Sequence, residues 1–153
     1  MKFSSKIEKC GLSPMRKFHP YAVAAEAKGR NIYHLNIGQP DVVTPQAFFD
    51  AVKNFEQPVL EYAASPGLPA LIDAIQNYYA NLNMNFEKDE ILITTGGSEA
   101  LQIVLCSILD EGDEILIPEP YYPNYNTMVT LTGGVIKPIP TTPEEGYHYA
   151  DRA

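Results

Sequence analysis

Cysteine and histidine, which form disulfides and bind metals, are scarce in this sequence. It has two cysteines, Cys10 in a polar N-terminal segment and Cys106 in an apolar one, so no disulfide framework is predicted. Cys106 is expected to be a small core residue. The three histidines are scattered without the spacing of metal ligands, and no metal site is predicted; they are His19, His34 and His148.

Positive charge and long apolar runs are also scarce. The formal net charge is −8, which argues against nucleic acid or an anionic membrane as a partner. No apolar run approaches the length of a membrane span, and residues 1–15 lack the apolar core of a signal peptide. We therefore expect a cytoplasmic protein. The hydrophobic content of 45% is that of an ordinary globular domain with a core.

The common nucleotide-binding fingerprints are absent, since the sequence has neither G-x-G-x-x-G nor G-x-x-x-x-G-K-[ST]. It has instead a different glycine turn between a strand and a helix. The apolar, β-branched run 91–95 predicts a buried strand, which the Gly-Gly pair 96–97 ends. Ser98 is a good N-cap for the next helix, which is apolar over most of its circumference as far as Leu109. Such a helix is expected to be packed on two sides and to end at 110–112.

This turn has the chemistry of an anion site. Glycine lets the backbone approach a ligand closely, and the first N–H groups of a helix have no internal partner. The N–H groups of Gly97, Ser98 and Glu99, with the Ser98 hydroxyl, would hold a phosphate at the positive end of the helix dipole. A Gly-Gly pair also makes an ordinary tight turn, and the turn by itself does not decide between the two interpretations.

The rest of the chain predicts alternating helices and strands. Helices are expected over 20–27, after a Thr44 cap with Pro45 in the first position, over 69–82 and over 124–131; strands are expected over 114–117 and 135–139, with a strand or extended segment over 32–36. Residues 1–19 resemble an arm, and 141–153 show no obvious element. The order β-α-β-α-β indicates a doubly wound parallel sheet that binds its ligand at the carboxyl ends of its strands.

Four separated segments carry a resemblance to a known family. They are LNIGQPD at 35–41, Tyr62 with Gly67, TGGSEAL at 95–101 and PEPYYPNY at 118–125. In this order and spacing, from about Ser13 to its end, the sequence resembles the class I/II aminotransferases, which are pyridoxal-phosphate (PLP) enzymes of fold type I. It is most similar to their aspartate-aminotransferase-like branch.

The resemblance implies a fold class and a domain organisation. The fold would be α/β, with three layers (α/β/α) around the mostly parallel, doubly wound sheet of the fold type I large domain, present here only in part. Residues 1–38 would form an N-terminal arm and helix. Residues 39–153 would form the N-terminal part of the PLP-binding large domain.

The resemblance also assigns roles to single residues. The turn at 97–99 would bind the phosphate of pyridoxal 5′-phosphate, and Tyr122 would stack on its pyridine ring. Gly38 would offer its N–H to the α-carboxylate of the substrate, at a place where a Cβ would crowd that carboxylate. Tyr62 would donate its hydroxyl to the phosphate of the cofactor bound by the partner subunit. The protein would then be a homodimer with shared active sites.

Each of these residues also has an ordinary structural interpretation. The segment 38–41 has turn-forming composition, and a tyrosine in a Pro/Gly loop, such as Tyr62, is usually a surface packing residue. Tyr121, Tyr122 and Tyr125 would in that case all cover the end of the sheet. We favour stacking for Tyr122 and the covering role for the other two tyrosines.

The activity that the resemblance implies is transamination between an amino acid and a 2-oxo acid, of the aspartate type or related. In the family a lysine holds PLP as a Schiff base and moves the proton, and none of the eight lysines here lies in such a context. We therefore expect an N-terminal fragment of an aminotransferase that is inactive alone. The alternatives are a non-catalytic α/β domain that binds a phosphate ligand, or the remnant of a truncated aminotransferase gene. Ser98 replaces a lysine found in some relatives with acidic substrates, so the amino donor stays open.

Overall fold

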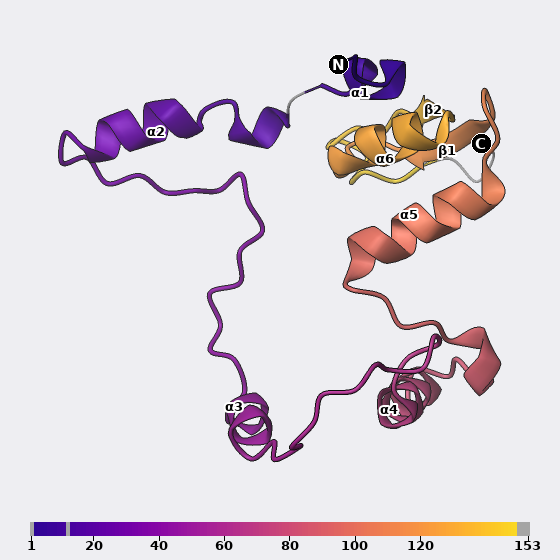
Figure 1. Ribbon diagram of the computed structural model, residues 1–153. Helices are drawn as coiled ribbons and strands as arrows, with labels where there is room; N and C mark the ends of the chain where they lie inside the picture. Colours follow the sequence, from indigo (N-terminus) through magenta and orange to yellow (C-terminus); the bar gives the residue numbers. More distant parts are fainter. Residues whose placement is uncertain (1, 12, 150–153) are drawn as a thin grey trace. The chain divides into compact units, whose positions relative to one another are not determined.

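The computed structural model describes residues 2–11 and 13–149, in which helices outnumber strands (Figure 1). The elements are α1 (Ser5–Lys9), α2 (His19–Glu26), α3 (Gln46–Lys53), α4 (Pro69–Ala80), α5 (Gly97–Ile108), β1 (Glu114–Pro118), α6 (Asn124–Thr132) and β2 (Val135–Ile139), with short 3₁₀ turns at Pro14–Arg16 and Lys88–Glu90. Within this described part, none of the helices is long and apolar enough to cross a membrane. Residues 141–149 form no helix or strand, as predicted; 150–153 lie outside the described residues.

The chain divides into two units. The first consists of the chain up to Gly38 together with the chain from Ser98 onward, and the second is Gln39–Gly97. The first unit is therefore discontinuous in sequence, whereas the second is a single contiguous segment. The domain boundary predicted after residue 38 stays a prediction.

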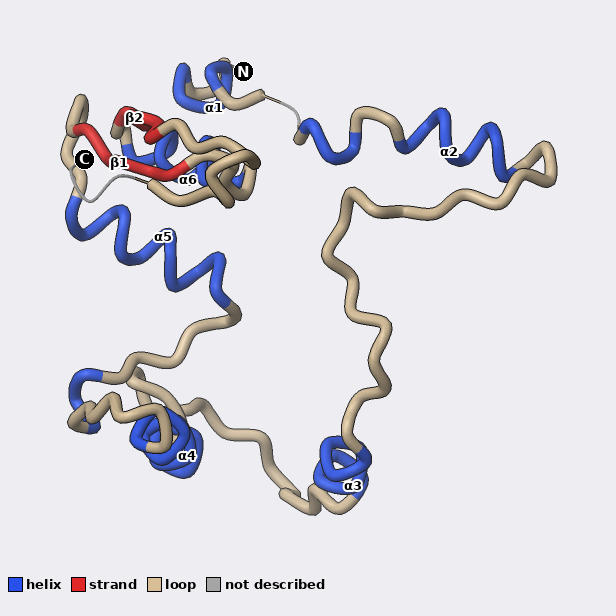
Figure 2. The backbone as a smooth tube through the Cα atoms, turned by 180° about the vertical axis from the view of Figure 1, so that it is seen from behind, coloured by secondary structure: helices blue, strands red, loops and turns tan. Residues whose placement is uncertain are grey.

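The first unit is built around a β1–α6–β2 crossover, in which α6 connects two parallel strands (Figure 2). The register pairs Glu114 with Val135 and Pro118 with Ile139. The core consists of the buried residues Leu105, Met128 and Val129, with Leu109, Ile115, Tyr125 and Ile136 packed against it. Both strands and α6 lie where the sequence predicts them, because short β-branched runs and a closing glycine pair are local signals.

The end of α6 explains that glycine pair. Gly133 has a φ of 96°, a left-handed conformation that closes the helix. Its N–H donates to the carbonyl of Thr130 (3.2 Å), and the N–H of Gly134 donates to the carbonyl of Val129 (3.1 Å). A Cβ at Gly133 would lie 3.2 Å from Cα of Glu111, so the turn before β1 and the end of α6 meet closely here, at a left-handed φ that favours glycine.

The predicted N-terminal arm contains a helix. Ser4 caps α1, its side chain accepting from the N–H of Lys6 (3.3 Å), and this one-turn element has too few residues to show a periodicity. The ammonium of Lys6 donates to the carbonyl of Leu131 near the end of α6 (3.2 Å) and pairs with Glu111 (3.3 Å). The sequence does not predict this helix, which packs against α6.

Helix α5 differs from its prediction in two respects. It begins at Gly97, so Ser98 lies inside the first turn and is not the N-cap. Leu105 is its buried residue, whereas Val104 is 52% exposed, so the predicted packing on two sides is wrong. The predicted core position of Cys106 is wrong as well, because the residue is exposed. Burial of a second face requires elements that cover it, and the described part of the chain covers only the side of Leu105.

The second unit contains α3, α4 and the segment predicted as a buried strand. The run 91–95 forms no strand: its Ile93 N–H donates to the carbonyl of Pro66 (2.9 Å), and Leu92 is 56% exposed. An extended run becomes a strand only beside a partner strand, and the described residues pair only β1 with β2. The run 32–36 likewise forms no strand.

The helices of the second unit largely follow the sequence. Helix α4 covers most of the predicted range and buries Ile72. The N-cap of α3 is Pro45, which has an extended ψ of 136°, so the helix begins one residue later than a Thr44 cap requires and that prediction is wrong. The loop 62–67 lies close against the run 91–95, since a Cβ at Gly67 (φ 122°) would lie 2.6 Å from Cβ of Ile93.

Candidate functional site

The glycine turn presents an open helix N-terminus. The Gly96 N–H donates to the carbonyl of Thr94 (2.8 Å), whose hydroxyl donates in turn to the Gly96 carbonyl (3.0 Å). A Cβ added at Gly96 or Gly97 would meet no atom within 4 Å, so space is open at this end of α5. Ser98 and Glu99 belong to the first helical turn, whose N–H groups point toward this end of the helix. Thr95 and Glu99 each already take part in an interaction of their own.

Tyr122 lies in the loop that follows β1, at the carboxyl end of the parallel pair. The loop is fixed to the end of β2, because the Glu119 N–H donates to the Ile139 carbonyl (2.9 Å) and the Thr141 hydroxyl donates to the Glu119 carbonyl. Tyr122 is 45% exposed. The side-chain amide of Asn124 donates to the Tyr122 hydroxyl oxygen (2.8 Å). The loop therefore holds a partly open aromatic ring at the place where α/β folds bind ligands.

The neighbouring tyrosines form a cluster with Tyr122. The rings of Tyr122 and Tyr125 meet edge to face, with centroids 5.9 Å apart and planes at 88°. Tyr121 stacks on Tyr125 at 6.3 Å and 12°, and its hydroxyl donates to Asn126 (3.1 Å). Tyr121 and Tyr125 are thus engaged in packing, while Tyr122 is the most exposed of the three rings.

The remaining predicted site residues lie elsewhere in the chain. Gly38 is at the end of the segment that follows α2, in the first unit, and a Cβ there would meet nothing within 4 Å. Tyr62 belongs to the second unit and is fully exposed. The structure brings Tyr122 together with Asn124 and Tyr125, and no described contact joins Tyr122 to Gly38. The sequence analysis did not name Asn124 as a site residue. The available signal was its position, two residues after Tyr122 and at the start of a predicted helix.

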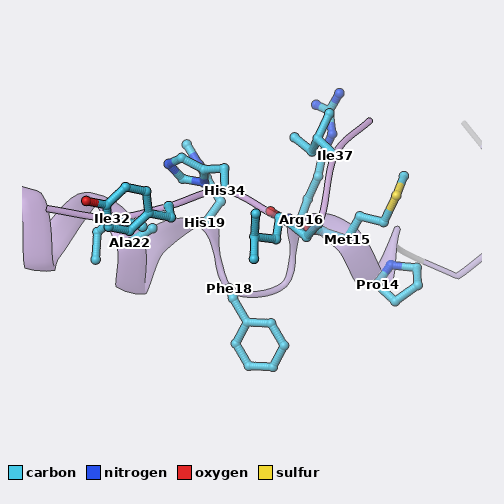
Figure 3. Close-up of a pocket in the computed structure, with 12 residues that line it drawn as sticks. Pro14, Met15, Arg16, Phe18, His19, Ala22, Ile32, His34 and Ile37 are labelled. Atoms are coloured by element: carbon cyan, nitrogen blue, oxygen red, sulfur yellow. Dashed lines mark hydrogen bonds between the residues drawn. The ribbon is translucent and has the colours of Figure 1, made fainter. Parts of the chain in front are cut away.

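A separate apolar hollow lies beside α2 (Figure 3). Its volume is about 710 Å³, and it is lined by residues of two segments, Pro14–Ala22 and 32–37. The Asn36 amide donates to the Met15 carbonyl (2.7 Å) across it. None of the predicted site residues lines this hollow, so it is not part of the candidate site.

Comparison with known proteins decides the family. The profile of the family described as aminotransferase class I and II matches residues 30–150. The chain belongs to this family. It is 36% identical over 124 residues to the aspartate aminotransferase of Bacillus sp. strain YM-2, covering 80% of this chain and 32% of that protein. It is 34% identical over 137 residues to the aspartate aminotransferase of Geobacillus stearothermophilus, covering 88% and 35%.

Solved structures agree with this assignment. A double mutant of Thermus thermophilus aspartate aminotransferase superposes with a TM-score of 0.88 at 30% identity, covering 96% of this chain and 39% of that one. An alanine aminotransferase from Pyrococcus furiosus gives a TM-score of 0.83 at 31% identity, covering 95% and 38%. The predicted fold class, the α/β fold of the fold type I enzymes present in part, is confirmed. This aminotransferase-family chain spans about a third of the length of the curated relatives it matches.

Proposed function

We propose that the protein takes part in PLP-dependent transamination between an amino acid and a 2-oxo acid. The observation that supports this most directly is Tyr122, a partly exposed ring held at the carboxyl end of two parallel strands in a chain of the aminotransferase family. In this proposal the chain contributes the phosphate and ring contacts of the cofactor site. Because the chain covers about a third of its relatives, the activity of the whole protein is part of the proposal.

The residues present fit the phosphate of PLP. The open space at Gly96 and Gly97 lets a phosphate reach the first N–H groups of α5. In our proposal the N–H groups of Gly97, Ser98 and Glu99 and the Ser98 hydroxyl hold it, at the positive end of a helix of 12 residues. When bound, PLP supplies the electron sink that transamination requires.

The residues also fit the ring of the cofactor and the substrate. Tyr122 has exposed ring surface on which a pyridine ring can stack, and stacking against a cationic pyridinium adds to apolar burial. Gly38 has open space beside its backbone, where we place the α-carboxylate of the substrate. Tyr62 presents its whole side chain to solvent, and we propose that its hydroxyl reaches the cofactor phosphate of a partner subunit in a homodimer.

We propose aspartate or a related amino acid as the amino donor. The names of the relatives support this, since those quoted above are mostly aspartate aminotransferases, with one alanine aminotransferase among the solved structures. A role in amino acid biosynthesis and a cytoplasmic location accompany this proposal.

The test is binding of pyridoxamine 5′-phosphate to residues 1–153, measured by calorimetry. This probe carries an amine, so it forms no imine with surface lysines. We expect binding that Tyr122→Ala weakens about tenfold, through loss of ring stacking, and that Ser98→Ala also weakens. Tyr33→Ala is the matched control, since Tyr33 is 82% exposed and outside the proposed site.

The same experiment separates the alternative of a general phosphate-binding domain. Such a domain would bind inorganic phosphate as well as the probe, and Tyr122→Ala would leave both affinities unchanged. That result would refute the proposed cofactor site.

A further inference from the structure

We infer that Asn124 and Tyr125 are positioning residues for Tyr122, which hold its ring in a single orientation before a ligand arrives. The inference rests on the proposed function of Tyr122 as the stacking residue. It starts from two contacts that converge on this one side chain: the amide of Asn124 donates to its hydroxyl oxygen (2.8 Å), and the ring of Tyr125 meets it edge to face (5.9 Å).

Asn124 fixes the far end of the Tyr122 side chain. It is the first residue of α6, so its backbone is held by the helix while its amide reaches back to the loop. The amide N–H uses one acceptor position of the phenol oxygen and leaves the O–H of Tyr122 as a donor. The bond therefore restricts the swing of the side chain about χ1 and orients its hydroxyl at the same time.

Tyr125 connects the Tyr122 ring to the core of the first unit. Tyr125 packs against the buried cluster of Leu105, Met128 and Val129. Its other contact, the stack with Tyr121, is held by the hydrogen bond from Tyr121 to Asn126. The orientation of the exposed ring is thus set by residues that are themselves fixed by the fold.

A ring fixed in advance binds a planar ligand better than a mobile one. A side chain that is ordered only on binding loses rotamer entropy, which lowers the affinity. Asn124 and Tyr125 remove this loss before binding. Both residues should therefore raise the affinity for the cofactor. The effect of Asn124 should also require the hydroxyl of Tyr122, to which it donates its hydrogen bond.

A double-mutant cycle tests this dependence. The affinity for pyridoxamine 5′-phosphate is measured for the 153-residue chain and for Asn124→Ala, Tyr122→Phe and the double variant. We expect Asn124→Ala to weaken binding about fivefold in the presence of Tyr122. In the Tyr122→Phe background we expect no effect, because the hydroxyl that accepts the bond from Asn124 is absent. Asn77→Ala is the matched control, since Asn77 is an exposed asparagine in α4, outside the tyrosine cluster.

A second measurement needs no ligand. With tyrosine labelled by ¹³C at Cζ, and the Tyr122 signal identified by its loss in Tyr122→Phe, we expect Asn124→Ala to shift that signal and Asn77→Ala to leave it in place. Tyr125→Leu keeps an apolar side chain against the core and is expected to broaden the same signal, because the ring gains motion. Thermal unfolding of each variant shows that it is folded.

The outcomes separate the two proposals. Equal effects of Asn124→Ala in both Tyr122 backgrounds, or an unshifted Tyr122 signal, would overturn the positioning role even if the cofactor binds. No binding of the probe by the unmodified chain would instead overturn the proposed cofactor site, and the Cζ shift alone would then decide whether Asn124 holds the ring.

Discussion

The close contact of Gly67 with Ile93 allows a quantitative prediction. Gly67→Ala introduces two costs: an alanine at a φ of 122° is strained by about 1 kcal/mol or more, and a Cβ placed 2.6 Å from Cβ of Ile93 overpacks the contact, which typically costs about 1–3 kcal/mol. We expect a loss of about 3 kcal/mol in the free energy of unfolding of the second unit. With an m-value of about 2 kcal/mol/M, the midpoint of urea unfolding falls by about 1.5 M.

Two control variants separate these costs. Gly29 also has a left-handed φ, 76°, but a Cβ there meets nothing within 4 Å, so Gly29→Ala carries the strain alone, about 1 kcal/mol. In an Ile93→Gly background, Gly67→Ala should likewise cost about 1 kcal/mol, because the Cβ that Ile93 presents to residue 67 is gone. The assay is urea unfolding followed by circular dichroism. If Gly67→Ala costs no more than Gly29→Ala, the reasoning from the close contact is refuted.

Three further predictions concern the rest of the chain. Lys6→Met should lower the free energy of unfolding by less than about 1 kcal/mol, because the Lys6–Glu111 ion pair is solvent-exposed. It should nevertheless speed proteolysis within α1, and unchanged cleavage would show that Lys6 does not hold this helix. Cys106 is exposed and Cys10 half-buried, so a thiol reagent should modify Cys106 first, and the reverse order in Cys→Ser variants would contradict the structure. Residues 1–153 should give no turnover of aspartate or alanine with 2-oxoglutarate, since no lysine lies in the required context; sustained turnover in a coupled dehydrogenase assay would disprove this.

Local patterns were sufficient to predict most elements. The helices α2, α4 and α6 have proline near the start or glycine beyond the end, and β1 and β2 are short apolar runs between turns. Such signals act within a few residues, so they are visible in one sequence. Helix α1 was missed because five residues are too short to show a periodicity.

Burial could not be predicted in the same way. The run 91–95 has the composition of a buried strand, and α5 has that of a helix packed on two sides, but composition states only what a segment would favour beside suitable neighbours. In the described chain neither segment has those neighbours. A predicted core position such as that of Cys106 is wrong for this reason.

Single residues of the candidate site could be predicted from the sequence, but the hydrogen bonds between them could not. The resemblance drew attention to Ser98 and Tyr122, whose roles stay predictions. It assigned no role to Asn124, although this residue lies in the matched segment 118–125, because a hydrogen bond between side chains two residues apart depends on the backbone between them. Here Pro123 and the start of α6 set that backbone, and only the structure shows the result.

The hydrogen bond of Lys6 to Leu131 has a consequence for biosynthesis. The two residues are 125 positions apart, so at typical rates of translation the ribosome delivers the acceptor on the order of ten seconds after the donor. During that interval α1 lacks α6 as a surface on which to pack, whereas the contiguous segment Gln39–Gly97 is completed before the interval ends. We therefore expect the middle of the chain to become ordered first during synthesis, and the two ends to join only when α6 has emerged.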